Sequence, residues 1–182
     1  MSNGQSLKRK RPALTIALVG VMAATLECVK LALSALPNIE AVTLLTALFS
    51  YVFGWYGLLA SIVFVCIEPL IYGFNTWVVS YFLYWPLVSA VFMLLSHKKL
   101  TNRWLITLIA LILTAWFGVL TSLVDIGLLS GFFDNFFYRF SVYYARGAIF
   151  YIAQIATNAV LFPLLFTFLS KKLFILKTKL YL

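Results

Sequence analysis

The chain has 182 residues, of which 64% are apolar and only 10% are charged, whereas roughly a quarter of the residues of a soluble domain are charged. This composition excludes an ordinary soluble domain and predicts an all-α integral membrane protein. The net charge of +9 is assigned to membrane topology and contact with anionic lipid, and not to nucleic-acid binding.

Six membrane spans are predicted from apolar runs of about 20 residues, the length that crosses a hydrocarbon core of about 30 Å. The second and third runs are short, so one tilted or hairpin-like unit over 39–73 is the alternative. Two spans are preferred because Pro37-Asn38, Gly54/Gly57 and Gly73-Phe74-Asn75 break the pattern at even intervals. The six spans of this single membrane domain, 1–182, lie near 12–35, 39–54, 57–73, 76–96, 104–124 and 145–170.

Basic residues cluster before the first span, between the fourth and fifth, and after the sixth. With six spans these clusters share one side, which the positive-inside bias makes cytoplasmic, so both termini (1–11 and 171–182) are expected in the cytoplasm. No cleavable signal peptide is expected, because the first span is too long for one and no small-residue cleavage site stands out. The clusters consist of Lys8, Arg9, Lys10 and Arg11; Lys98, Lys99 and Arg103; and Lys171, Lys172, Lys177 and Lys179.

The small residues of the first span form a candidate docking face. They give two pairs spaced four apart, and such pairs allow two membrane helices to approach closely. The first span is therefore the best candidate for docking to another membrane protein. The face consists of Ala13, Ala17, Gly20 and Ala24.

The acidic residues all fall on the outer side of this topology, together with three basic residues. Ionisable groups in a membrane are costly unless they are paired or face a cavity, so each is a candidate site residue. The acids are Glu27, Glu40, Glu68, Asp125 and Asp134, and the bases are Lys30, Arg139 and Arg146.

Glu27 and Lys30 are three residues apart on the first span and can form a pair on one helix face. That pair is either part of a site or a self-neutralising pair that makes the span insertable. Glu68 precedes Pro69, which removes a backbone donor and kinks helices. Such a break often lines a cavity, although a glutamate that snorkels at a helix end is the alternative.

Aromatic residues form one broad face in the outer half of the fourth span. They predict either the wall of a pocket or an interfacial belt. Tyr84 and Trp85 lie about two turns in, below the usual belt, which favours a pocket. The face consists of Trp77, Tyr81, Tyr84 and Trp85.

The sixth span carries a polar and aromatic stripe at helical spacing. Gln154 fits a ligand or helix–helix hydrogen bonding equally well, whereas the deeper Asn158 favours hydrogen bonding between helices. Arg146 opens this span and could pair with Asp125, Asp134 or Glu68. The stripe consists of Tyr143, Gly147, Tyr151, Gln154 and Asn158.

The phenylalanine-rich segment 125–144 is expected to be the longest external connection. It predicts either an aromatic loop that closes over an outward-facing pocket or a short interfacial helix.

Enzyme and metal motifs are missing from the sequence. We find no zinc-protease, nucleophile-elbow or phosphate-loop motif, so no catalytic residue is predicted and the chain is expected not to be an enzyme. Cys28 and Cys66 lie in apolar segments without a CxxC motif, and His97 stands alone, which leaves disulfide and metal sites unsupported.

Taken together, these features resemble the substrate-binding S components of energy-coupling factor (ECF) vitamin transporters, which are ABC transporters of bacterial cell membranes. The resemblance covers nearly the whole chain and includes the pair Ala13 and Ala17, the segment 36–45 with Phe53-Gly54, and the segment 68–74 that contains Glu68 and Tyr72. It implies ATP-dependent vitamin uptake with a transmembrane coupling subunit and two cytosolic ATPases, which alone would use ATP. It implies no covalently bound cofactor, and Ala13 and Ala17 match its docking motif.

The chain is similar to the lactobacillal branch of S components thought to take up cobalamin, so cobalamin is the first expectation for the ligand. Riboflavin, a queuosine precursor and folate are the alternatives. A small membrane enzyme and a structural or regulatory membrane subunit are rival functions. The predicted ligand residues are Glu27, Lys30, Glu68, Tyr72, Trp77, Tyr81, Tyr84, Trp85, Tyr143, Arg146, Tyr151 and Gln154.

Overall fold

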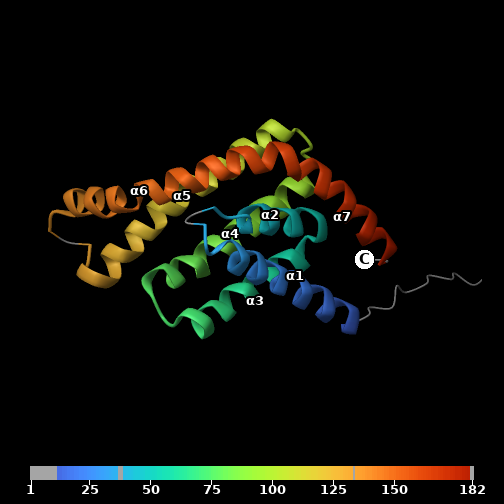
Figure 1. Ribbon diagram of the computed structural model, residues 1–182, viewed down its shortest axis with the longest axis horizontal. Helices are drawn as coiled ribbons and strands as arrows, with labels where there is room; N and C mark the ends of the chain where they lie inside the picture. Colours follow the sequence, from blue (N-terminus) through green and yellow to red (C-terminus); the bar gives the residue numbers. More distant parts are fainter. Residues whose placement is uncertain (1–11, 37–38, 133, 181–182) are drawn as a thin grey trace, which may run out of the picture.

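A computed structural model (Figure 1) describes residues 12–36, 39–132 and 134–180. These residues are all-helical, and no strand occurs among them. The predicted basic N-terminus, 1–11, and the breaker Pro37-Asn38 lie outside the described residues. The helices are α1 (Pro12–Leu33), α2 (Val42–Phe53), α3 (Trp55–Tyr72), α4 (Thr76–His97), α5 (Arg103–Ser130), α6 (Phe136–Leu161), the π-helical turn η1 (Phe162–Phe166) and α7 (Thr167–Lys179).

Among the described residues, five helices have the length and apolar composition of membrane spans. They are α1, α3, α4, α5 and the continuous unit formed by α6, η1 and α7. The second predicted span, 39–54, contains the 12-residue helix α2, which is about 18 Å long at 1.5 Å per residue. Helix α2 is therefore shorter than a hydrocarbon core of about 30 Å, and the sixth span stays a prediction.

Helix α2 lies at the centre of the bundle (Figure 1) and packs against α1, α3, α4, α6, η1 and α7. All of its residues except Leu45 are buried. A helix that is apolar all round fits such a position. Because protein surrounds α2, its ends can lie at membrane depth and hydrogen-bond to other residues of the chain.

Two contacts fix the far end of α2. Lys177 Nζ of α7 donates a hydrogen bond of 2.7 Å to the backbone oxygen of Val52. This lysine therefore satisfies a carbonyl of the last turn of α2, where a cation is also favoured by the helix dipole. The Tyr51 hydroxyl donates to the backbone oxygen of Leu100 at 2.8 Å.

The turn between α2 and α3 depends on two glycines. Gly54 adopts a φ of +60°, a region that favours glycine. At Gly57 a Cβ atom would overlap the backbone of Phe49 and Ser50, so α3 approaches α2 more closely than another residue would allow. The break at Gly54 divides 39–73 into two separate helices, α2 and α3.

The predicted aromatic loop over 125–144 is wrong, because most of this segment is helical. Helix α5 continues to Ser130, α6 begins at Phe136, and only 131–135 connects them. The rings of Phe136, Phe140 and Tyr144 stack at four-residue spacing, with centroids 6.0 and 5.9 Å apart. Side chains four apart adjoin on a helix, so this spacing supports a helix and not a lid.

The α5–α6 hairpin extends beyond the other helices at one end of the long axis (Figure 1), while the start of α1 and the end of α7 lie toward the opposite end. After α6 the helix continues through η1, which contains Pro163. A proline lacks the amide hydrogen that an α-helix needs, and a π turn absorbs the mismatch. Phe162 and Phe166 of η1 are buried and pack against Phe92 of α4.

Candidate functional site

A cavity of about 330 Å³ lies beside the N-terminal end of α2. Helices α1, α3, α4, α5 and α6 contribute to its walls, together with the connection between α1 and α2. The lining residues are Lys30, Leu33, Ser34, Leu36, Ile39, Glu40, Val42, Thr43, Tyr72, Trp77, Tyr81, Tyr84, Trp85, Phe117 and Gln154.

Most of the predicted ligand residues meet at this cavity. The aromatic face of α4 lines it, as do one residue each from α1, α3 and α6. Glu68 and Glu27 are not among the lining residues, but they lie behind Lys30 and interact with each other. The predicted residues that line the cavity are Lys30, Tyr72, Trp77, Tyr81, Tyr84, Trp85 and Gln154.

The aromatic residues of α4 form one continuous wall. Ring centroids are 5.0 Å apart between Trp77 and Tyr81 and 5.4 Å apart between Tyr81 and Trp85. Phe117 of α5 continues the wall at 4.7 Å from the ring of Tyr84. Tyr84 and Trp85 are only 2% and 5% exposed, so they are inside the protein and do not belong to an interfacial belt.

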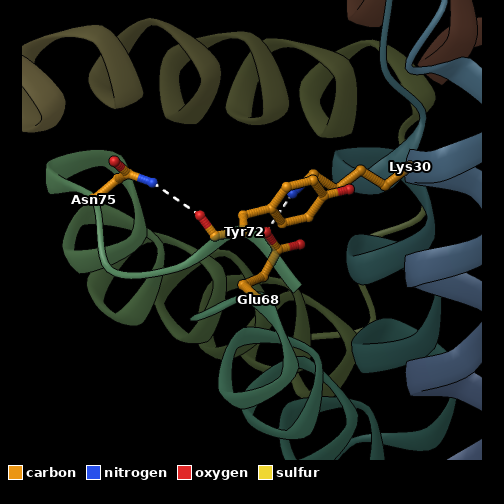
Figure 2. A network of polar contacts seen from close by, with 4 residues as sticks. All are labelled: Lys30, Glu68, Tyr72 and Asn75. Atoms are coloured by element: carbon orange, nitrogen blue, oxygen red, sulfur yellow. Dashed lines mark hydrogen bonds and ion pairs between the residues drawn. The ribbon is translucent and has the colours of Figure 1, made fainter. Parts of the chain in front are cut away.

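Lys30 is held at the edge of this wall by an ion pair with Glu68 (Figure 2). Its Nζ also lies over the rings of Tyr72 and Trp77, 4.2 and 4.9 Å from their centroids, as in cation–π contacts. Asn75 Nδ2 donates to the Tyr72 backbone oxygen at 3.1 Å and fixes the α3–α4 turn (Figure 2).

This ion pair replaces the predicted pair of Glu27 and Lys30 on α1. The long lysine side chain reaches across to α3, whereas Glu27 is buried at 8% exposure. Glu68 is fully buried at 0% exposure, so the interpretation of Glu68 as a snorkelling side chain is wrong. The contact joins two helices 38 positions apart in the sequence.

Glu27 and Glu68 place two carboxylates beside a single ammonium group. Both side-chain oxygens of Glu27 and the Oε1 atom of Glu68 are buried, and none of them accepts a hydrogen bond from the described residues. With Lys30, the cluster carries a formal charge of −1. Buried carboxylates are costly when they lack partners, so this cluster depends on Lys30.

Glu40 lines the cavity, although it was only a general candidate among the outer acids and was not one of the predicted ligand residues. Its carboxylate accepts hydrogen bonds from Thr43 N at 2.9 Å and from Thr43 Oγ1 at 2.6 Å. Asn158 Nδ2 donates to Glu40 Oε1 and to Thr114 Oγ1, at 3.1 Å each. The signal that could have located it is an acid directly before an apolar helix, where ionisable groups are costly unless they are paired or face a cavity.

The other lining residues that were not predicted come mainly from the α1–α2 connection. Except for the aromatic Phe117 of α5, they are short or aliphatic and belong to the end of α1, the connection or the start of α2, and nothing in their sequence pattern separates them from residues that face lipid. They are Leu33, Ser34, Leu36, Ile39, Val42, Thr43 and Phe117.

The α6 stripe divides into a site residue and structural residues. Gln154 lines the cavity, and Asn158 is buried in hydrogen bonds between helices, as the sequence predicted for it. Tyr151 lies against Gly118 and Gly147, and its hydroxyl is 3.0 Å from Thr121 Oγ1. This ring packs α6 on α5 and does not line the cavity.

Two further predicted ligand residues lie elsewhere on α6. Tyr143 and Arg146 are not among the lining residues, and the guanidinium carbon of Arg146 lies 6.0 Å from the Tyr143 ring centroid. Both lie near the protruding end of the α5–α6 hairpin, because that segment is helical and does not fold back over the cavity.

The small residues of α1 lie on its exposed side. Ala13, Ala17, Gly20 and Ala24 are all exposed, and no atom lies within 4 Å of the position of a Cβ on Gly20. This face is free for lipid or another helix, and its docking role stays a prediction.

The fold and the cavity define a multi-helix bundle of membrane-spanning character with an aromatic-walled cavity. No known protein family, curated protein or solved structure matches the chain.

Proposed function

We propose that this protein is the substrate-binding subunit of an ECF-type transporter and that it binds a compact aromatic molecule in the cavity. The observation that carries this proposal is the aromatic-walled cavity at the N-terminal end of α2. Small-molecule sites are typically concave and mostly apolar with a few placed polar groups, which describes this cavity.

The proposed topology counts α2 as a sixth, short crossing, so that both termini lie in the cytoplasm, and it places the cavity toward the outside of the cell membrane. Its support is the basic clusters together with the start of α1 and the end of α7, which lie toward the same end of the molecule (Figure 1). The cavity uses the last turns of α1 and α3 and the first half of α4. These segments lie away from the start of α1, which follows the basic N-terminus.

The proposed ligand is a compact vitamin or vitamin precursor. Typical small-molecule pockets measure about 300–1,000 Å³, and this cavity of about 330 Å³ is near the lower limit. A ligand of one or two rings suits that volume, whereas cobalamin, with its corrin macrocycle and nucleotide tail, is far larger. We therefore place compact aromatic vitamins ahead of cobalamin, which stays in the test series.

Binding by the isolated subunit tests this proposal. We expect the purified chain to bind one B vitamin or precursor in a calorimetric screen, with a nanomolar to micromolar Kd. Trp77→Ala should weaken that binding at least tenfold, since stacking on an aromatic ring is lost. Trp116→Ala is the matched control, because Trp116 is 44% exposed and does not line the cavity. Absence of binding across the series, cobalamin included, would contradict the proposal.

Transport requires partners in this proposal: a transmembrane coupling subunit and two cytosolic ATPases, with α1 as the docking helix. We expect Ala17→Trp to abolish ATP-driven uptake in cells that carry these partners while ligand binding stays unchanged, because the bulky ring prevents close helix approach. Val160→Trp is a control at another exposed site. Loss of binding in Ala17→Trp, or normal uptake, would count against docking through this face.

A small membrane enzyme is the second candidate, favoured by the buried cluster of Glu27, Glu68 and Lys30 beside the cavity. Turnover of a lipid or isoprenoid by the purified protein would support it. A protein that binds a vitamin and leaves it unchanged would exclude this candidate.

A further inference from the structure

The charges on the cavity wall do not balance. Lys30 and Glu40 are the charged residues among those that line the cavity. Lys30 is neutralised by its ion pair with Glu68, and Glu27 adds a second carboxylate behind it. Among the described residues, the hydrogen-bond donors to Glu40 are a backbone amide, a hydroxyl and a side-chain amide, none of which is charged. Lys30, Glu68, Glu27 and Glu40 together carry a formal charge of −2, and the charge of Glu40 at the lining is not compensated by a cation in the described part of the chain.

Glu40 keeps capacity for one more donor. A carboxylate offers about four lone-pair positions. Thr43 uses two of them, and Asn158 uses a third. These three bonds hold the carboxylate in a fixed orientation at the start of α2 while it lines the cavity.

The aromatic wall already binds one cation. The ammonium group of Lys30 lies 4.2, 4.9 and 5.1 Å from the ring centroids of Tyr72, Trp77 and Tyr81. Aromatic faces attract positive charge, and the attraction is larger where water is excluded. Because Lys30 occupies these contacts, the positive charge of a ligand is best placed at Glu40, with its ring against the remaining aromatic lining.

From these observations we infer that the ligand is a compact planar organic cation, such as a protonated heteroaromatic amine or a quaternised heterocycle. Its charge or N–H donor is held by Glu40, and its ring packs against the wall formed by Trp77, Tyr81 and Trp85. This inference rests on the proposed small-molecule binding function and specifies the class of ligand.

The bonds at the start of α2 use both oxygens of Glu40, because Oε2 accepts from Thr43 N and Oε1 accepts from Thr43 Oγ1 and Asn158 Nδ2. None of these donors is charged, so the bonds orient the carboxylate without neutralising it. A carboxylate beside a cavity inside a membrane bundle is costly unless a cation or donor meets it. The ligand supplies that charge in the bound state.

Matched probes that differ in charge test the inference. We would measure calorimetric binding of 1-methylnicotinamide (cation), nicotinamide (neutral) and nicotinate (anion), and of thiamine (cation) and its neutral oxidation product thiochrome. The cations are expected to bind at least tenfold more tightly than their neutral and anionic counterparts. Equal or tighter binding of a neutral or anionic member would overturn the inference.

The Glu40→Gln variant tests whether Glu40 is the residue that gives the preference for cations. It should lose about ten- to a hundredfold in affinity for the cations, the range of a hydrogen bond to a charged group, while affinity for neutral probes is unchanged. Asp125→Asn is the matched control, because it removes an acid outside the cavity lining and should leave all affinities unchanged. Unchanged affinity of a folded Glu40→Gln variant for the cations would also overturn the inference.

The outcomes separate this inference from the proposed function. If no compound in these series or in the vitamin screen binds, the proposed function and the inference both fail. If compounds bind but cations have no advantage, only the inference fails. The comparison of probes uses the unmodified protein, so it stays decisive even if Glu40→Gln does not fold.

Discussion

A Lys30→Met variant is expected to lose about 3–5 kcal/mol of stability, the usual cost of removing one partner from a buried ion pair. Glu68 is 0% exposed and its Oε2 accepts from Lys30, while its Oε1 has no hydrogen-bond partner among the described residues. Without the ammonium group, two neighbouring carboxylates would stay buried. Thermal unfolding in detergent should show a lower Tm, with weakened ligand binding.

Two further variants make this expectation specific. The double variant Lys30→Met with Glu68→Gln should recover much of the loss, because a neutral pair no longer leaves a buried charge unpaired. Glu27→Gln should be neutral or stabilising, since it removes a buried charge whose oxygens lack hydrogen bonds. A Lys30→Met protein as stable as the unmodified chain would show that the ion pair is unimportant. Strong destabilisation by Glu27→Gln would reveal a partner for Glu27.

A Gly57→Ala variant is expected to be destabilised by about 1–3 kcal/mol or more, as in other overpacked interiors. Its new Cβ would overlap backbone atoms of Phe49 and Ser50, which no change of rotamer can move. Helices α2 and α3 would therefore have to separate, and α2 carries one side of the cavity at its other end. The Tm for thermal unfolding and the affinity for the ligand should both be lower than in the unmodified protein.

Gly20→Ala is the matched control for this substitution. No atom lies within 4 Å of its new Cβ, and alanine favours a helix over glycine by about 1 kcal/mol. Its Tm should be unchanged or raised. A Gly57→Ala variant that melts at the same temperature as Gly20→Ala would exclude a tight contact between α2 and α3.

The aromatic wall could be predicted because its signal is local. Trp77, Tyr81, Tyr84 and Trp85 lie on one helix at spacings that place them on one face, and the cavity uses that face. The lysine–glutamate pair could not be predicted, because its partners lie on different helices 38 positions apart. From the sequence alone, the expected partner of Lys30 is Glu27, which is three residues away on the same helix.

The depth of α2 was equally hidden from sequence reasoning. An apolar segment that faces lipid and one that is surrounded by protein have the same composition, so 39–54 was predicted as a span. The segment 125–144 shows a different error, because its glycines suggest a loop although most of the segment is helical. The four-residue spacing of Phe136, Phe140 and Tyr144 was the local helical signal that could have corrected it.

Helix α2 is held by hydrogen bonds at both of its ends. At its start, Glu40 bonds to Thr43 and to Asn158 of α6. In its last turn, the Val52 carbonyl accepts from Lys177 of α7. A single helix of three turns therefore joins the cavity lining to the last turns of α7 through hydrogen bonds at its two ends, without an intervening loop.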